Sequence, residues 1–186
     1  MRRCANKWSV ADPTLAMASL PYLVDNYFGW EKEKLDSNGL FWQTDNNDGM
    51  EVSIGGKGST NNAGYRATIN SYMYGDAVAI TEIARLSGNP EIVENFSAKA
   101  RTIKENLQTK LWDEQAGFFK VLSRDPGSSL CTARELHGYT PWMYNLPDSK
   151  YSKAWKFLMD PKYFYAPYGP TTAEQGHPGF ETCRWK

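Results

Sequence analysis

The sequence lacks a charge excess of either sign. Of its 186 residues, 21 are Lys or Arg and 21 are Asp or Glu, so the formal net charge at pH 7 is zero. Proteins that bind nucleic acid present a basic patch or stripe, and membrane-surface proteins carry polybasic segments. The balanced composition therefore argues against a nucleic-acid partner and against binding at a membrane surface.

Long apolar runs are missing as well. No run approaches the roughly 20 apolar residues that cross a bilayer. The first seven residues carry charge, and no apolar stretch follows them as it would in a signal peptide. The sequence therefore predicts neither a transmembrane segment nor a signal peptide, and it leaves the location of the protein open.

Cysteine and histidine are scarce, with three Cys and two His. Cys4, Cys131 and Cys183 are widely spaced and form no CxxC motif, so we expect free thiols. His137 and His177 are far apart in the sequence and have no neighbouring ligand residues at metal-site spacing. We therefore expect no metal site and no cofactor.

Aromatic residues, in contrast, are abundant, with 7 Trp, 11 Tyr and 8 Phe. Most of them are expected to fill the core. Flat aromatic side chains also form the walls of ligand sites, where the C–H faces of sugar rings stack on them. The composition thus leaves a carbohydrate ligand open without establishing one.

Apolar periodicity predicts paired helices. Apolar residues recur every three or four positions over 65–86 and again from Asn89-Pro90 to about residue 111, with Gly88 placed as a C-terminal glycine between them. So short a connection predicts an antiparallel helical hairpin. An earlier helix is expected to start at Asp12-Pro13 and to be kinked or restarted by Pro21.

The fold class that follows is all-α. A further helix is expected over 149–158, whereas 117–122 is strand-like, 134–146 reads as a loop with a helical turn, and 160–186 shows no regular pattern. Tight turns and long aromatic-rich loops alternate between the helices. This alternation is typical of an array of antiparallel helical hairpins with long functional loops.

The long loop over 40–63 is the candidate functional segment. It contains Asp45, Asp48 and Glu51 among Trp, Met and Gly residues. A carboxylic acid in apolar surroundings has a raised pKa and can donate a proton near neutral pH, as a glycosidase requires. The alternative for each acid is a capping or turn role. The residue order of a calcium-binding EF-hand loop is not present.

A family pattern runs through six stretches in the same order along the chain: 39–42 (GLFW), 48–53 (DGMEVS), 65–77, 111–119, 135–142 (ELHGYTPW) and 169–175 (GPTTAEQ). In this order they resemble the six-hairpin (α/α) toroid glycosidases. Within that clan the resemblance is to the mannosylglycerate-hydrolase-like and glycoside hydrolase family 63-like group. It implies that 1–186 is part of a catalytic domain, an incomplete (α/α)6 toroid whose N- and C-terminal hairpins are missing.

The resemblance implies an inverting glycosidase that acts on an α-linked sugar. In family 63-like members the general acid is an Asp two residues after a Gly, and Glu51 holds that position after Gly49. The change from Asp to Glu keeps the carboxyl group and lengthens its reach. We expect Glu51 to be the acid, with Asp48 as the alternative, and we expect the general base to lie outside this chain.

Four substrate-binding residues are expected around the loop. Trp42 would form a wall of the −1 sugar site. Tyr65, Arg66 and Asn70 lie where the following helix begins, next to the loop that bears Glu51. Arg66 would hold an acidic substrate group or orient a catalytic carboxylate, and its alternative is a salt bridge within the hairpin array.

Three further candidates lie later in the chain. Tyr139 and Trp142 would form a second aromatic rim, and plain core packing is their alternative. Glu174 is a second carboxylate on a loop. We expect Glu174 to orient the substrate or a catalytic partner more readily than to serve as the base itself.

Two other classes of protein compete with a glycosidase. A non-catalytic carbohydrate-binding or scaffold half-toroid would keep the aromatic cleft and lack the base, and a sugar would protect it from thermal unfolding without turnover. A polysaccharide lyase would use Tyr65 as base with Arg66 and Asn70 as neutralisers, and would release an unsaturated product that absorbs in the ultraviolet. Composition and pattern say nothing of the oligomeric state.

Overall fold

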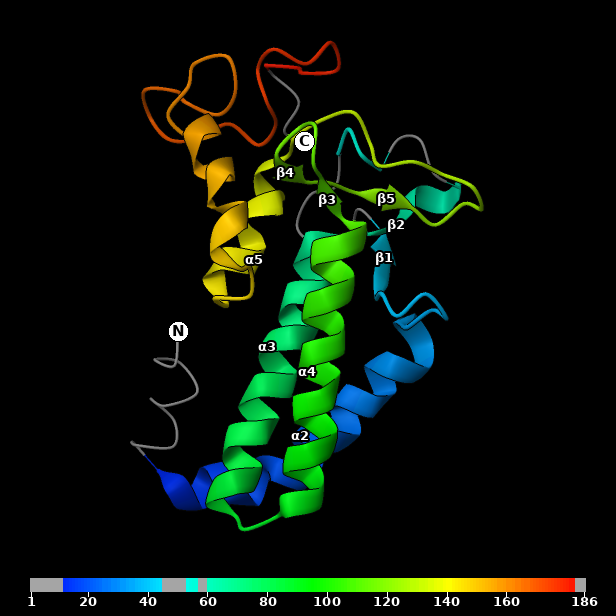
Figure 1. Cartoon of the computed structure of the whole chain (residues 1–186), viewed down its shortest axis with the longest axis vertical. Coiled ribbons are helices and arrows are strands. Elements are labelled where there is room, and N and C mark those ends of the chain that lie inside the picture. Colours follow the sequence, from blue (N-terminus) through cyan, green and yellow to red (C-terminus); the bar gives the residue numbers. More distant parts are fainter. Residues whose placement is uncertain (1–11, 45–52, 57–59, 183–186) are drawn as a thin grey trace.

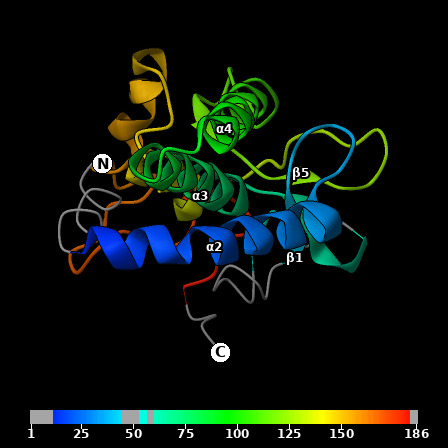
Figure 2. The ribbon, with the colours of Figure 1, turned by 90° about the horizontal axis from the view of Figure 1, so that it is seen from below.

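The frame of the molecule is a group of three long helices. The computed structural model describes residues 12–44, 53–56 and 60–182. Helix α2 (Pro13–Lys34) packs against α3 (Ala67–Leu86), and α3 runs antiparallel to α4 (Pro90–Lys110), as Figure 1 and Figure 2 show. The helical hairpin predicted from the sequence is confirmed.

The helix ends follow the local signals in the sequence. The Asp12 carboxylate accepts a hydrogen bond from the Leu15 N–H at 3.0 Å, which caps α2. Helix α2 then continues through Pro21 as one helix, so no restart occurs there. After α3, Gly88 has a φ of +68°, and the Asn89 N–H donates to the Ala84 carbonyl at 2.9 Å. This is a Schellman-type end, and it turns the chain directly into α4.

Short strands form a layer where α3 begins and α4 ends (Figure 1). Strand β1 (Trp42–Thr44) pairs antiparallel with β2 (Ala63–Tyr65), and β2 pairs antiparallel with β5 (Leu122–Ser123). Strand β3 (Trp112–Asp113) pairs antiparallel with β4 (Phe118–Phe119). The sequence predicted strand character only over 117–122, so β1, β2 and β3 are additions to the expected all-α array.

The chain after β5 is less regular. It contains the 3-10 helix η3 (Leu136–Tyr139), one turn of α-helix α5 (Thr140–Met143) and the 3-10 helix η4 (Ser149–Phe157). The helix expected over 149–158 is therefore present in the tighter 3-10 form. A single bridge between Glu135 and Ala173 joins the C-terminal segment to the start of η3.

The hydrophobic core has two parts. One lies among α2, α3 and α4, where the rings of Tyr27 and Phe96 meet edge to face with centroids 5.0 Å apart. The other is an aromatic cluster that includes residues of β3 and β4. In it the ring centroid of Phe118 lies 4.8 Å from that of Tyr139 and 5.6 Å from that of Phe164. Core packing thus accounts for much of the aromatic content. None of the described helices is long and apolar enough to cross a membrane.

Candidate functional site

The candidate catalytic loop joins the strand layer at both of its ends. Glu51 and Asp48 lie outside the described residues. Before them, Gln43 and Thr44 are held in β1 by pairing with Gly64 and Ala63 of β2. After them, 53–56 forms a turn that contacts the segment preceding η3. The structure therefore defines the backbone on either side of the two acids.

Glu135 holds the segment that follows Glu51. Its Oε1 accepts a hydrogen bond from the Ile54 N–H at 2.8 Å, and its Oε2 accepts one from the Gly55 N–H at 3.0 Å. The Glu135 residue is only 2% exposed. Burial raises the pKa of the Glu135 carboxyl, but His137 and these two N–H groups outweigh it and keep the pKa below its ordinary value.

Glu135 is a residue that the sequence reasoning missed. It lies within the 135–142 stretch that carries the family pattern, but nothing local in the sequence links it to Ile54, which is 81 positions away. A glutamate followed by a helical turn reads as an ordinary N-terminal residue of that turn. Only the fold shows that its side chain serves a different segment.

Trp42 and Tyr65 line an open pocket of about 540 Å³ beside the β1–β2 pair. The Tyr65 hydroxyl donates to Asp36 Oδ2 at 2.8 Å. Arg124 donates to the same carboxylate twice, from Nε at 2.8 Å and from Nη2 at 3.0 Å. The Lys34 Nζ lies 3.9 Å and the Arg124 Cζ 4.1 Å from the centroid of the Trp42 ring. A sugar stacking on Trp42 would compete with these cations.

The strand register separates this pocket from the Glu135 contact. Trp42 pairs with Tyr65, so their side chains share one face of the sheet, while Gly64 belongs to the other face. Val121 lies on the Gly64 side, 3.0 Å from where a Cβ of Gly64 would stand, and it also lies against Gly55. Trp42 and Tyr65 therefore lie across the sheet from Gly55 and its bond to Glu135.

The Asp36 network gives the first testable prediction. Hydrogen bonds from Arg124 lower the pKa of Asp36, burial opposes them, and the Tyr65 hydroxyl adds to the lowering. Because the folded-state pKa lies below the unfolded value, Asp36 adds stability above about pH 4 that is lost as the pH falls through the folded-state pKa. We expect Asp36→Asn to destabilise the protein at about pH 6 and to have a smaller effect at about pH 3.

Urea unfolding of the wild type and of Asp36→Asn at the two pH values measures this difference. An equal loss of unfolding free energy at both values would show that the Asp36 charge contributes nothing through its ion pair. In that case the side chain would act by shape and neutral hydrogen bonding only.

Arg66 and Asn70 are buried at the start of α3, and each is 0% exposed. Arg66 takes the N-cap position, and its Nη2 donates to the Asn62 carbonyl at 3.5 Å. The Asn70 side chain accepts from the Phe41 N–H at 2.9 Å and donates to the Phe41 and Arg66 carbonyls at 2.8 and 2.9 Å. Backbone groups thus occupy the Asn70 amide, which fixes the start of the loop on α3.

Tyr139 and Trp142 belong to the aromatic cluster of the core. The Tyr139 hydroxyl donates to the Ala154 carbonyl at 2.8 Å, and its ring stacks on Trp155 with centroids 4.8 Å apart. The Trp142 ring packs on the Phe119 ring, with centroids 5.5 Å apart. Both residues therefore contribute to core packing, and Trp155, 43% exposed, is the member of the stack that reaches the surface.

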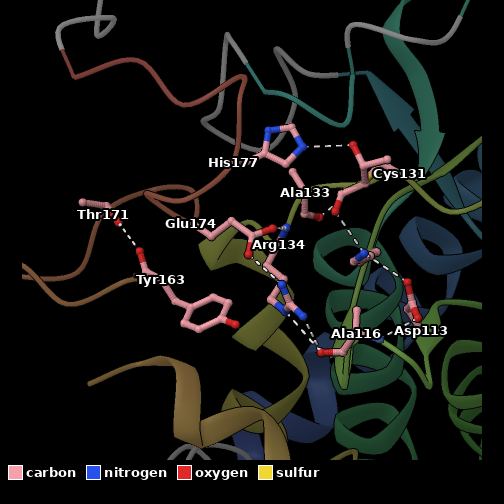
Figure 3. A network of polar contacts seen from close by, with 11 residues as sticks. Asp113, Ala116, Cys131, Ala133, Arg134, Tyr163, Thr171, Glu174 and His177 are labelled. Carbon is pink, nitrogen blue, oxygen red and sulfur yellow. Dashed lines mark hydrogen bonds and ion pairs between the residues drawn. The ribbon is translucent and has the colours of Figure 1, made fainter. Parts of the chain in front are cut away.

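Glu174, in the C-terminal segment, forms an ion pair with Arg134, which lies just before η3 (Figure 3). It accepts from the Arg134 N–H at 2.8 Å and from Arg134 Nη1 at 2.6 Å. Arg134 also donates to the Ala116 carbonyl, at 2.8 Å from Nη2, and its guanidinium lies 4.4 Å from the centroid of the Phe157 ring. Glu174 thus joins the C-terminal segment to the strand layer.

A metal site is not found among the residues that the structure describes. Within 12–44, 53–56 and 60–182, no three His, Cys, Asp or Glu side chains are grouped so that they could hold a metal ion. Cys131 is a free thiol, and burial raises its pKa to about 11, so it stays protonated at neutral pH. Cys4 and Cys183 lie outside the described ranges.

Comparisons with known proteins agree on the class of this chain. The family model of the mannosylglycerate hydrolase MGH1-like glycoside hydrolase domain matches residues 5–186. A solved structure titled "Sialidase" is 42% identical with a TM-score of 0.86, and the match covers 93% of this chain but 16% of that one. No curated protein gave a significant match.

A second solved structure supports the fold alone. It is the GH78 family rhamnosidase of Bacillus sp. GL1, which is 15% identical with a TM-score of 0.65, and the match covers 89% of this chain and 17% of that one. The chain therefore spans only a small part of either solved structure. On the strength of the family match over nearly its whole length, the chain belongs to the mannosylglycerate hydrolase MGH1-like glycoside hydrolase family.

Proposed function

We propose that this chain is the acid-bearing part of an inverting glycoside hydrolase that acts on an α-linked sugar. Glu51 is the general acid, Asp48 is the alternative, and the general base lies outside this chain. The observation that carries the proposal is the pair of hydrogen bonds from the Ile54 and Gly55 N–H groups to buried Glu135. They hold the backbone three residues after Glu51 in one place, as an acid that must meet a glycosidic oxygen requires.

The other end of the loop is held equally well, and this supports the same function. Asn70 fixes the Phe41 backbone on α3, and β1 then pairs with β2 up to Thr44. A general acid has to lie within hydrogen-bonding distance of the oxygen that it protonates. An acid carried by a loop needs that loop to be anchored, and the described backbone is anchored on both sides of 45–52.

The charges of the described residues support a base outside this chain. An inverting glycosidase needs a second carboxylate about 6.5–9.5 Å from the acid, with a water molecule to activate. Among the described residues, the buried carboxylates are Glu135 and Glu174. Glu135 is committed to backbone N–H groups and Glu174 to Arg134, so neither offers a carboxylate to a water molecule.

The size of the solved relatives supports a larger catalytic domain. This chain corresponds to 16% of the sialidase chain and 17% of the rhamnosidase chain. A closed toroid has six hairpins, and one long hairpin, α3–α4, is described here. The relative titled sialidase adds acidic sugars to the substrates worth testing, and Arg66 at the start of α3 is our candidate for orienting a catalytic carboxylate or holding an acidic group.

The experiment compares the 186-residue chain with the longer protein that we propose contains it. Both are incubated with a panel of α-linked glucosides, mannosides, rhamnosides and sialosides, and free sugar is measured. We expect hydrolysis by the longer protein and none by the chain alone. Hydrolysis by the purified chain would contradict the external base and would promote Glu174 to that role.

The pocket lined by Trp42 and Tyr65 favours one second candidate, a non-catalytic carbohydrate-binding protein. A thermal unfolding assay with the same sugar panel distinguishes the glycoside hydrolase from the binding protein. Protection of the longer protein by a sugar that it never hydrolyses would favour binding. A lyase would be recognised by an ultraviolet-absorbing unsaturated product in the same reactions.

A further inference from the structure

Glu135 differs in what it binds from the carboxylates of the described chain that form ion pairs. It is buried, and both of its oxygens accept N–H groups of a segment about 80 positions earlier, at 2.8 and 3.0 Å. Asp36, Asp113, Asp148 and Glu174 are all paired with Lys or Arg. Glu135 instead has His137, whose Nε2 lies 3.5 Å from its Oε2.

We propose that Glu135 is a positioning residue for the general acid, an inference that rests on the proposed function. Ile54 is three residues after Glu51. A chain spans at most about 3.3–3.6 Å per residue, so only a short stretch of backbone separates the Ile54 N–H that Glu135 binds from Glu51. Glu135 thereby acts on the proton transfer through the backbone and touches no substrate itself.

The chemistry of the contact requires a carboxylate. Two N–H groups point at one side chain, and each takes its own oxygen. A glutamine offers one acceptor oxygen and one NH₂ group, so one of the two N–H groups would face another donor. Hydrogen bonds to an ionised acceptor are also about twice as strong as neutral ones. Glu135→Gln keeps the shape of the side chain and removes one of the two bonds.

Gly55 shows how closely the two segments approach. A Cβ at Gly55 would lie 2.7 Å from Glu135 Oε2 and 2.9 Å from Val121 Cγ2. Those distances are shorter than real contacts, so any larger residue would push the Glu135 carboxylate away. Gly55→Ala therefore reaches the same contact from the other side and should reproduce the effect of Glu135→Gln.

Hydrogen exchange tests the contact without any assay of activity. In the 186-residue chain, we expect Glu135→Gln to speed amide exchange at Ile54 or Gly55 by about tenfold or more, because a buried N–H loses its charged acceptor. Exchange in α3 and α4 should stay as in the wild type. No change at 54–55, or an equal rise throughout α3 and α4, would overturn the positioning role.

Asp113→Asn is the matched control. Asp113 lies in the same strand layer, accepts the Ala116 N–H at 2.8 Å and pairs with Lys120 at 3.0 Å. The substitution thus makes the same chemical change, carboxylate to amide, in a side chain that also accepts a backbone N–H but does not contact 53–56. We expect it to leave exchange at Ile54 and Gly55 unchanged, and a rise there would mean that any loss of charge in this layer loosens the segment.

Kinetics of the longer protein then test the link to Glu51. A glycosyl fluoride needs little proton donation to its leaving group, whereas an α-linked disaccharide depends on it. We expect Glu135→Gln to lower kcat on the disaccharide by about tenfold or more, with KM nearly unchanged and with a much smaller loss on the fluoride. Equal losses on both substrates would overturn the positioning role.

The two experiments separate this inference from the proposed function. If Glu51→Gln and Asp48→Asn each lower kcat by the same factor on the disaccharide and on the fluoride, neither residue is the acid and the proposed function fails. The exchange experiment decides in that case whether Glu135 holds the 53–56 segment. Faster amide exchange at 54–55, together with a loss of kcat on the disaccharide that is much larger than the loss on the fluoride, supports both the positioning role of Glu135 and the proposed function.

Discussion

Glu51→Gln is expected to lower kcat of the longer protein on an unactivated α-linked substrate by about 10²- to 10⁴-fold, the usual contribution of a general acid. The amide keeps the size of the side chain and removes the proton that the leaving oxygen needs. KM should change little, because the effect falls on the transition state and not on substrate binding. Initial rates over a range of substrate concentrations give both constants.

Asp48→Asn is the matched variant for this experiment, because Asp48 is a second acid in the same loop. We expect a smaller loss than with Glu51→Gln. A larger loss in Asp48→Asn would move the general acid to Asp48. A loss below about tenfold in both variants would exclude the loop as the source of the acid.

Arg134→Ala is expected to lower the free energy of unfolding by about 3–5 kcal/mol, the usual cost of removing one partner of a buried ion pair. The Arg134 and Glu174 side chains are 16% and 8% exposed. The variant leaves the Glu174 carboxylate buried without its cation, and it also removes the donors to the Ala116 carbonyl. Urea unfolding of the 186-residue chain measures the difference.

Lys153→Ala is the control for this prediction. Lys153 also forms an ion pair, with Glu114, and its Nζ also lies over an aromatic ring, that of Trp112, 5.4 Å from the centroid. This pair is exposed, however, and exposed ion pairs contribute little. We expect nearly unchanged stability. Similar losses in the two variants would mean that the burial of the Arg134 pair has no energetic consequence.

The parts of the fold that could be predicted from sequence are those set by local signals. Asp12 caps the start of α2, and Gly88, with its positive φ, ends α3. Both signals could be predicted because each involves only residues within a few positions of one another. The start of α3 was misplaced by two residues. Tyr65 pairs with Trp42 in β2 and Arg66 is extended, so α3 begins at Ala67. Strand pairing across the loop overrode the helical periodicity there.

The candidate site was harder to predict because its contacts are between distant segments. The bonds from Glu135 to Ile54 and Gly55 span about 80 positions, and the Arg134–Glu174 pair spans 40. The sequence shows that a carboxylate is present but not what it binds. It placed Asn70 near the loop correctly, whereas only the structure shows that the Asn70 amide binds the Phe41 backbone.

The stereochemistry of hydrolysis is the most direct test of the central claim. The longer protein is mixed with an α-linked substrate, and ¹H NMR follows the anomeric signals from the first minutes of the reaction. An inverting mechanism predicts that the β-anomer appears first and only later equilibrates with the α-anomer. Initial release of the α-anomer would show retention and a nucleophilic carboxylate, and would contradict the inverting mechanism and the general base proposed beyond this chain.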